Sequence, residues 1–193
     1  MLRNPDLHAI EKDVKKQLDK PRFEHTRGVM YTAAALAMKY GVSVEDAMIA
    51  GLLHDYAKNI PNEQKLALCE YYKLPVSDIE KQDPKLLHGR LAAYYANTKF
   101  GIRNLEILHA IEFHTTGCTN MTLMDMIIYV ADYIEPNRQV LPGISEIRQL
   151  AFEDIKKATT RILADSIEYI NKKEALLDPN TVEAYEWCLS TVD

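Results

Sequence analysis

Apolar residues along the chain recur at helical spacing. Val29, Ala33 and Leu36 fall on one face of the stretch 22–40, and Gly41 follows it directly. A face that repeats every three or four residues indicates an amphipathic helix, and a glycine is a common helix stop. Similar signals predict further helices over 43–54, 61–74, 83–100, 105–114, 122–135, 145–173 with at most one break, and 178–187.

Capping signals support these boundaries. Ser43 with Asp46, and Thr122 with Asp125, have the spacing of capping boxes. Asp83 precedes a proline, as expected for an N-cap followed by proline in the first helical position. Sustained two-residue alternation between hairpin turns is missing, so no sheet is expected. The pattern predicts an all-α fold.

Length and composition narrow the class of protein. The 193 residues suit one domain, and the hydrophobic share of 47% suits a globular core. A net charge of −5 argues against nucleic acid as a partner. The first residues do not resemble a signal peptide, and the longest apolar stretch, 126–134, is too short to span a membrane. Three scattered cysteines favour reduced thiols and a cytoplasmic location.

Several ionisable residues stand at the ends of predicted helices or inside apolar stretches. They are His25, His54, Asp55, His88, His114 and Asp132. Burying such groups is costly unless a partner neutralises them, and a metal ion held inside a helix bundle can do so. Alternatively, the histidines are structural or exposed, Asp55 lies on the surface, and Asp132 pairs with an arginine or caps a helix. His8 and His109 are expected to be structural or exposed.

Basic residues near these positions indicate an anionic substrate such as a phosphate ester. They are Arg22, Arg27, Lys58, Arg90 and Arg138, although solvated surface charge is the simpler explanation for Arg27 and Arg90. Thr115 and Thr116 precede a glycine directly after His114, where hydroxyls and free backbone N–H groups could hold a phosphate. A plain C-terminal helix stop is the alternative at this point.

The order His25, His54-Asp55, Asp132 resembles the HD-domain metal-dependent phosphohydrolases, and His88 with His114 resembles their binuclear subset. Longer matches lie at 22–26, 53–58, 87–89, 114–117 and 131–136. Together these segments resemble the bacterial YqeK-type symmetrical bis(5'-nucleosyl)-tetraphosphatases. The likeness runs from about residue 22 to 185. Cys118 departs from it, since a basic residue is expected there, and His109 has no family role.

The resemblance implies an HD-domain helical bundle over 1–193, with the C-terminal helices from about 145 to 193 packed on it. It implies that a metal-bound hydroxide cleaves diadenosine tetraphosphate into two ADP. The cofactor would be one or two iron ions, with manganese, cobalt or zinc as substitutes. His25, His54, Asp55 and Asp132 would be ligands, and His88 with His114 would complete a second site or bind phosphate.

Other roles follow from the same resemblance. Asp55, Lys58, His88 and His114 would take part in catalysis. The substrate would contact Arg22, His88, His114, Thr115, Thr116, Asp132 and Arg138, and the loop Ala175, Leu176, Leu177, Asp178, Pro179 and Asn180 would cover the base or ribose. Two alternatives stay open: hydrolysis of another nucleotide, and a non-catalytic nucleotide sensor. By the same resemblance, the partner would be a small dinucleoside polyphosphate, and neither a membrane nor nucleic acid is expected. The oligomeric state is open, and a homodimer is among the options.

Overall fold

The computed structural model describes residues 6–138 and 142–190. In this part of the chain the elements are helices, and none is a strand. In order they are α1 (Leu7–Gln17), α2 (Lys20–Tyr40), α3 (Val44–Leu53), α4 (Asn62–Tyr71), α5 (Asp78–Gln82), a 3₁₀ turn (Pro84–Leu87), α6 (His88–Thr98), α7 (Leu105–Phe113), α8 (Leu123–Ile134), α9 (Ile144–Glu153), α10 (Ile155–Lys172) and α11 (Pro179–Ser190). The all-α prediction is confirmed.

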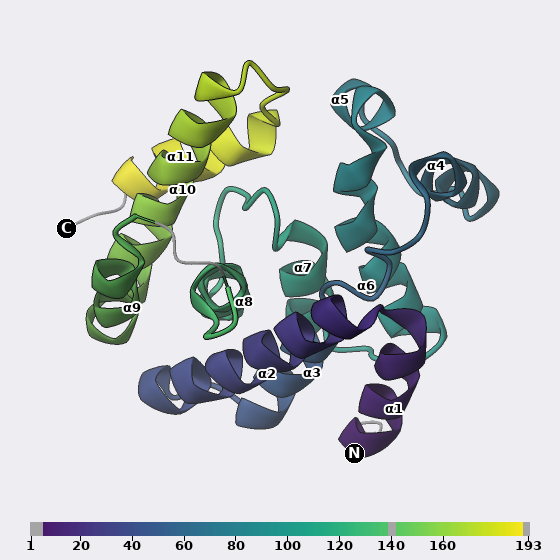
Figure 1. The fold of residues 1–193 in the computed structure, drawn as a ribbon, viewed down its shortest axis with the longest axis horizontal. Coiled ribbons are helices and arrows are strands. Elements are labelled where there is room, and N and C mark those ends of the chain that lie inside the picture. The colour runs from purple at the N-terminus through teal and green to yellow at the C-terminus, as the bar shows by residue number, and fades with distance from the viewer. Residues whose placement is uncertain (1–5, 139–141, 191–193) are drawn as a thin grey trace.

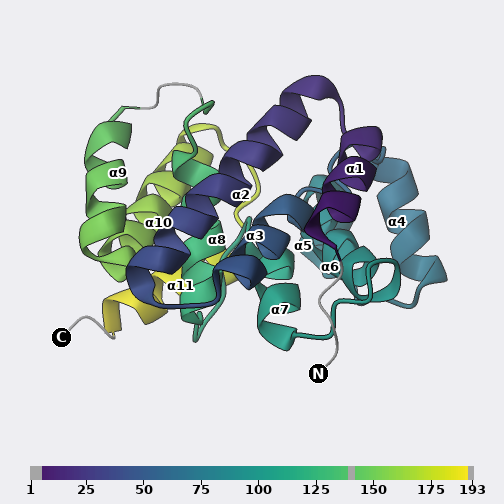
Figure 2. The same ribbon diagram turned by 90° about the horizontal axis from the view of Figure 1, so that it is seen from below.

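Helix α8 lies at the centre of the bundle. Ile127 through Ala131 are buried without interruption, so the helix is covered on every side. It packs against α2, α3, α7, α9 and α10. Figures 1 and 2 both place α9–α11 on one side of α8 and α4–α6 on the other. Side chains on α8 are therefore carried by a helix that its neighbours hold in place.

The predicted caps form at two helix starts. Thr122 and Asp125 make a full capping box at α8, where each side chain accepts a hydrogen bond from the other residue's backbone N–H. The Ser43 hydroxyl accepts the amide of Asp46 at 3.2 Å. Such caps satisfy N–H groups that the first helical turn cannot pair internally. The predicted break in the stretch 145–173 falls at Asp154, which caps α10.

Two helix boundaries and one short helix differ from the sequence prediction. Helix α4 ends at Tyr71, because Lys73 takes a left-handed conformation (φ 56°) before the proline at 75 is reached. The Asp83 carboxylate does not cap the next helix and instead pairs with Lys85 at 2.6 Å. A 3₁₀ turn follows, and α6 begins only at His88. Helix α5 was missed because five residues are too few to show a period.

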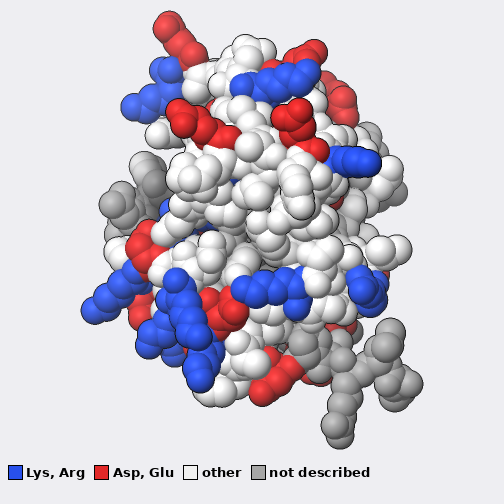
Figure 3. All heavy atoms as spheres, turned by 90° about the vertical axis from the view of Figure 1, so that its right-hand side faces the viewer, with Lys and Arg blue, Asp and Glu red and all other residues white. Residues whose placement is uncertain are grey.

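The surface around α4–α6 carries charges of both signs. Figure 3 shows Lys and Arg side chains interleaved with Asp and Glu around a broad uncharged middle. A nucleic-acid-binding face would gather basic residues in one patch or stripe. In Figure 3 the densest group of basic side chains, at the lower left, has acidic side chains beside it. Separately, none of the described helices is both long and apolar enough to cross a membrane.

Candidate metal centre

The six candidate ligands come together from five helices. His25 lies on α2 and Asp132 in the last turns of α8, while His54 and His114 follow the last residues of α3 and α7. Asp55 comes directly after His54, and His88 opens α6. Their ligand atoms form three overlapping groups, each within 4.8 Å: His25/His54/Asp55, His54/His114/Asp132 and Asp55/His88/His114. The bundle thus brings together residues that lie up to about a hundred positions apart in sequence.

Several close approaches in this group join imidazole nitrogens to carboxylate oxygens. His25 Nε2 lies 2.9 Å from Asp132 Oδ1, and His54 Nε2 lies 3.5 Å from Asp55 Oδ2. On the other side, Asp55 Oδ1 lies 3.2 Å from His88 Nε2 and 3.5 Å from His114 Nε2. Asp55 therefore stands between the two pairs of histidines, with one oxygen toward each pair.

Backbone contacts fix which nitrogen of each imidazole faces the cavity. Three Nδ1 atoms lie 2.6–2.7 Å from a backbone carbonyl, which can only accept, so each Nδ1 carries the proton. The pairs are His54 with Gly51, His88 with Lys85, and His114 with Ile111. The three Nε2 atoms consequently present lone pairs to the cavity. This is the tautomer that a metal ion binds, with the second nitrogen held by an outer partner.

Several buried polar atoms here have no hydrogen-bond partner. They are His25 Nε2, His54 Nε2 and Asp55 Oδ1. His25 Nε2 faces Asp132 Oδ1 at 2.9 Å, but the neutral imidazole has one N–H, and its Nδ1 proton already goes to Glu135. In addition, His88 Nε2 and His114 Nε2 lie 3.0 Å apart with lone pairs facing each other, which is repulsive unless a cation or a proton lies between them. Unpaired polar atoms are rare in protein interiors. A divalent metal ion would accept the lone pairs of these nitrogen and oxygen atoms, so the residues present fit a divalent metal.

Burial and neighbouring charges keep His54, His88 and Asp55 in the state that binds a metal. Burial, together with the nearby Lys58 ammonium, lowers the pKa of His88 to about 4, and burial lowers the pKa of His54. Both are therefore neutral at physiological pH. Burial raises the pKa of Asp55, but nearby positive charge, including the Lys58 ammonium, outweighs burial and holds that pKa well below its ordinary value. Asp55 is thus a carboxylate.

Glu135 is a residue of this site that the sequence reasoning did not select. It is buried at the end of α8, and its Oε1 accepts the Nδ1 proton of His25 at 3.0 Å. Its Oε2 accepts the backbone N–H of Asn137 at 2.7 Å. Gly28 on α2 leaves the space that this carboxylate occupies. A signal was available, since Glu135 follows Asp132 at the i, i+3 spacing that shares a helix face.

Cationic side chains surround the cluster. Arg22 Nη1 lies 2.8 Å from Asp55 Oδ2, and Arg138 Nη1 lies 3.1 Å from Asp132 Oδ1. Lys58 Nζ lies 3.0 Å from His88 Nε2. The Thr115 hydroxyl is within 3.2 Å of the same nitrogen. These groups could bind phosphate oxygens close to the metal ligands.

A cavity of about 700 Å³ opens onto this centre. Its lining includes the predicted residues Arg22, Asp55, Lys58, His114, Thr115, Asp132 and Arg138. It also includes side chains that were not predicted, among them Tyr133 of α8 and Ile162, Ser166, Tyr169 and Ile170 of α10. Along the sequence, these α10 residues read only as part of a helix that packs on the bundle.

Other predicted substrate contacts lie outside this lining. Thr116 borders a smaller space together with Asp178 and Asn180. Ala175, Leu176, Leu177 and Pro179 line neither space. A nucleotide contact for the loop 175–180 therefore stays a prediction.

Three residues that were expected to be structural or exposed have partners of their own. Arg90 pairs with Glu80 at 2.7 Å, and Arg27 lies near Glu11 at 3.1 Å. His109 contacts Asp125 at 2.9 Å, away from the candidate metal ligands.

The comparisons with known proteins agree with this geometry. The sequence pattern of the HD-domain family matches residues 22–137. A protein of Bacillus subtilis named "Bis(5'-nucleosyl)-tetraphosphatase, symmetrical" is 39% identical over 177 residues, which is 92% of this chain and 94% of the relative. A protein of the same name from Halalkalibacterium halodurans is 41% identical over 177 residues, or 91% of this chain and 93% of the relative.

A solved structure has nearly the same fold. It is a Clostridium acetobutylicum protein described as a predicted HD superfamily hydrolase involved in NAD metabolism. It superposes with a TM-score of 0.93 at 38% identity, covering 97% of this chain and 98% of its own. The chain therefore belongs to the HD-domain family and, within it, to the symmetrical bis(5'-nucleosyl)-tetraphosphatases.

Proposed function

We propose that this protein hydrolyses diadenosine tetraphosphate at its central anhydride and releases two ADP. The observation that carries the proposal is the set of unpaired, buried imidazole and carboxylate atoms, surrounded by Arg22, Lys58 and Arg138. The relatives that share most of this chain carry the name of that activity. A polyphosphate chain would replace the contacts that these cations now make with Asp55 and Asp132.

The donor set favours a transition metal. Imidazole and carboxylate ligands suit iron, manganese, cobalt or zinc better than magnesium or calcium. We propose iron as the native ion, held by His25, His54, Asp55 and Asp132, with His88 and His114 offering a second site. Asp55 would serve both sites, since its two oxygens face different histidine pairs. When bound, the metal supplies Lewis acidity and makes water a stronger nucleophile near neutral pH.

The reaction adds one water molecule across one P–O bond. The water oxygen bonds to the second phosphorus of one half, and the central bridging oxygen leaves with the other half as ADP. Lys58 and Arg138 stabilise the negative charge that spreads over the phosphates. His88 carries its proton on Nδ1 and has none on Nε2, so Lys58 is the better placed donor to the leaving oxygen. ADP is a good leaving group and needs little acid assistance.

Isotope labelling and product chromatography test this function. The iron-loaded chain, kept free of oxygen, is incubated with diadenosine tetraphosphate in ¹⁸O-labelled water. We expect ADP as the sole nucleotide product, with one ¹⁸O in the terminal phosphate of half the molecules. ATP with AMP would overturn the symmetrical cut. Tight binding without turnover would favour a sensor, and turnover of other nucleotides alone would indicate a different hydrolase.

A further inference from the structure

The candidate metal centre lies at the junction of two cavities. Asp55, His114 and Asp132 line the cavity of about 700 Å³, whereas His25 lines a neighbouring one of about 400 Å³. Arg22 and Arg138 line both. A substrate that is cut at its centre has identical halves on the two sides of the reacting phosphorus. If the proposed function holds, each half therefore needs its own space for phosphates and for a base.

The two cavities do not offer a base the same surroundings. The larger one has the rings of Tyr133 and Tyr169 and the apolar side chains of Ile162 and Ile170. The smaller one is lined mainly by polar and charged residues, and its described lining contains no Phe, Tyr or Trp. It suits phosphates, because Arg22 and Arg138 flank it, but it gives a purine ring no aromatic partner for stacking.

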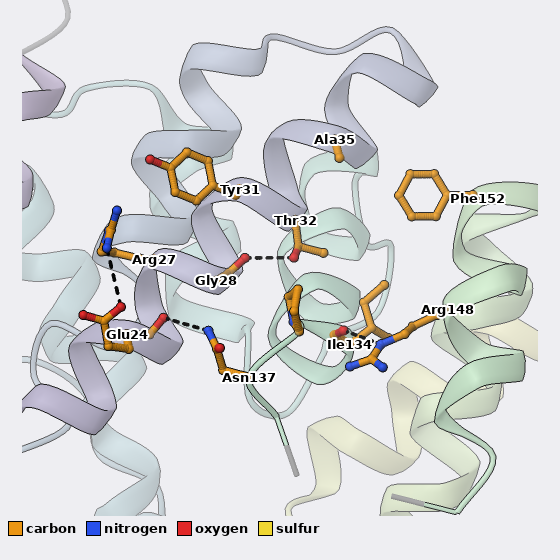
Figure 4. A pocket seen from close by; sticks show the side chains of 11 residues that line it. Glu24, Arg27, Gly28, Tyr31, Thr32, Ala35, Ile134, Asn137, Arg148 and Phe152 are labelled. Atoms are coloured by element: carbon orange, nitrogen blue, oxygen red, sulfur yellow. Dashed lines mark hydrogen bonds and ion pairs between the residues drawn. The ribbon is translucent and has the colours of Figure 1, made fainter. Parts of the chain in front are cut away.

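Aromatic rings lie one step further along the surface. A groove of about 520 Å³ between α2 and α9 shares Asn137 with the smaller cavity. In Figure 4, Tyr31 extends from α2 and Phe152 from α9, with Ile134 at the end of α8 between these two helices. The volume is within the roughly 300–1,000 Å³ of small-molecule sites. Tyr31 is 55% exposed and Phe152 41% exposed, so both rings are open to a ligand.

The polar residues of the groove fit a nucleoside as well. The guanidinium of Arg27 lies 6.0 Å from the centre of the Tyr31 ring, within the range of a cation–π contact. Arg148 donates to the carbonyls of Ile134 and Glu135, which holds the end of α8 as a rigid floor. The side-chain amide of Asn137 lies where the groove meets the smaller cavity. A chain of phosphates that passes Arg22 and Arg138 would lead toward this opening.

We propose that the groove between α2 and α9 is the subsite for the second nucleoside of the substrate. One ADP half occupies the larger cavity against α10. The other half places its phosphates beside Arg22 and Arg138 and its nucleoside in the groove, where the base stacks on one of the two exposed rings, Tyr31 at the α2 end or Phe152 at the α9 end. This inference rests on the proposed symmetrical cleavage and adds the location of the second half.

The test compares substrates that carry two nucleosides or one. Kinetics of diadenosine tetraphosphate hydrolysis are measured for the wild type and for Tyr31→Ala/Phe152→Ala. Adenosine 5'-tetraphosphate, which has the same phosphate chain on one nucleoside, serves as the competing inhibitor. Its single base can use the larger cavity. We expect the ratio of KM for the dinucleoside to Ki for the mononucleoside to rise about tenfold in the double variant, the effect of losing one stacked base.

Two control variants accompany the test. Met38→Ala removes another exposed apolar side chain of α2, 67% exposed and outside all three cavities, and should leave the ratio unchanged. Tyr31→Phe keeps a ring for stacking and should leave the ratio within about twofold of wild type. Circular dichroism shows whether each variant folds, which is expected because the altered rings are exposed.

The outcomes separate the subsite from the function. A wild type that does not turn over diadenosine tetraphosphate would overturn both. Wild-type turnover with an unchanged ratio in Tyr31→Ala/Phe152→Ala would overturn the subsite alone. A dimer that dissociates in this variant, seen by light scattering without a change in the ratio, would assign the groove to a second copy of the chain and also overturn the subsite.

Discussion

Replacing Gly28 by alanine should weaken the protein and its metal site, although alanine is the better helix former. A Cβ at this position would lie 2.2 Å from Glu135 Oε2 and 3.0 Å from its Cδ. The Glu135 carboxylate cannot move away freely, because His25 Nδ1 and the backbone N–H of Asn137 both hold it. Gly28→Ala therefore forces a buried carboxylate off its two donors.

The opposing free energies can be compared. In a helix interior, alanine stabilises by about 0.5–1 kcal/mol relative to glycine. Overpacking typically costs about 1–3 kcal/mol, and a buried group that loses its hydrogen-bond partner costs about 1–3 kcal/mol more. Even the smallest sum of the two costs, about 2 kcal/mol, exceeds the largest gain, about 1 kcal/mol, so we expect the free energy of unfolding to fall by at least about 1 kcal/mol. Loss of an outer partner of a metal-binding histidine should also reduce metal affinity about 10–100-fold.

A double-mutant cycle tests the mechanism. Urea unfolding without metal and calorimetric titration with Mn²⁺ are measured for Gly28→Ala, Glu135→Ala and the double variant. With the carboxylate removed, Gly28→Ala should become neutral or stabilise by up to about 1 kcal/mol. The interaction free energy would then be about 2 kcal/mol, a value typical of residues in contact. Wild-type stability and metal affinity in the single variant Gly28→Ala would refute the reasoning.

Four further outcomes are expected. Asp55→Ala, which removes the carboxylate between the two histidine pairs, should abolish metal binding and turnover together, and metal analysis that still finds a full complement would contradict this. Lys58→Met should lower kcat about 10²–10³-fold with the metal content unchanged, as for loss of one charge-stabilising donor, so a normal kcat with bound metal would exclude Lys58 from catalysis. Free metal at about 100 times its Kd should add ~2.7 kcal/mol to the free energy of unfolding, an increase that a chelator reverses; an unchanged urea midpoint would argue against a site of the folded state. Burial raises the pKa of Asp13, but hydrogen bonds from Lys99 and Tyr56 outweigh burial and lower that pKa. The Asp13 carboxylate therefore stabilises the fold fully above about pH 4, and this stabilisation is lost as the pH falls through the folded-state pKa. Since its side chain is 34% exposed, Asp13→Asn should reduce the unfolding free energy at pH 7 by only ~0.5–1 kcal/mol, and a difference that grows in acid would have the wrong sign.

Local signals predicted most of the helices because they act over a few residues. The capping box of Thr122 and Asp125 forms as predicted, since a hydroxyl and a carboxylate three positions apart need only their own backbone. The predicted end of α4 was wrong, because the left-handed turn at Lys73 has no glycine or asparagine to mark it. Helix α5 is too short for a period to appear. Such local errors leave the fold class unaffected.

The polypeptide sequence by itself determined the helical class, the family and the set of six polar residues at helix ends. Periodicity and caps depend on neighbouring positions, and the order of the motifs can be read directly along the chain. Only the tertiary structure decided which atoms of the six residues meet. It placed Glu135 behind His25 in the space beside Gly28, and it brought the α10 residues Tyr169 and Ile170 into the lining of the cavity that opens onto the candidate metal ligands. These contacts join segments that lie far apart along the chain, so they depend on how whole helices pack against α8 and not on any local pattern of residues.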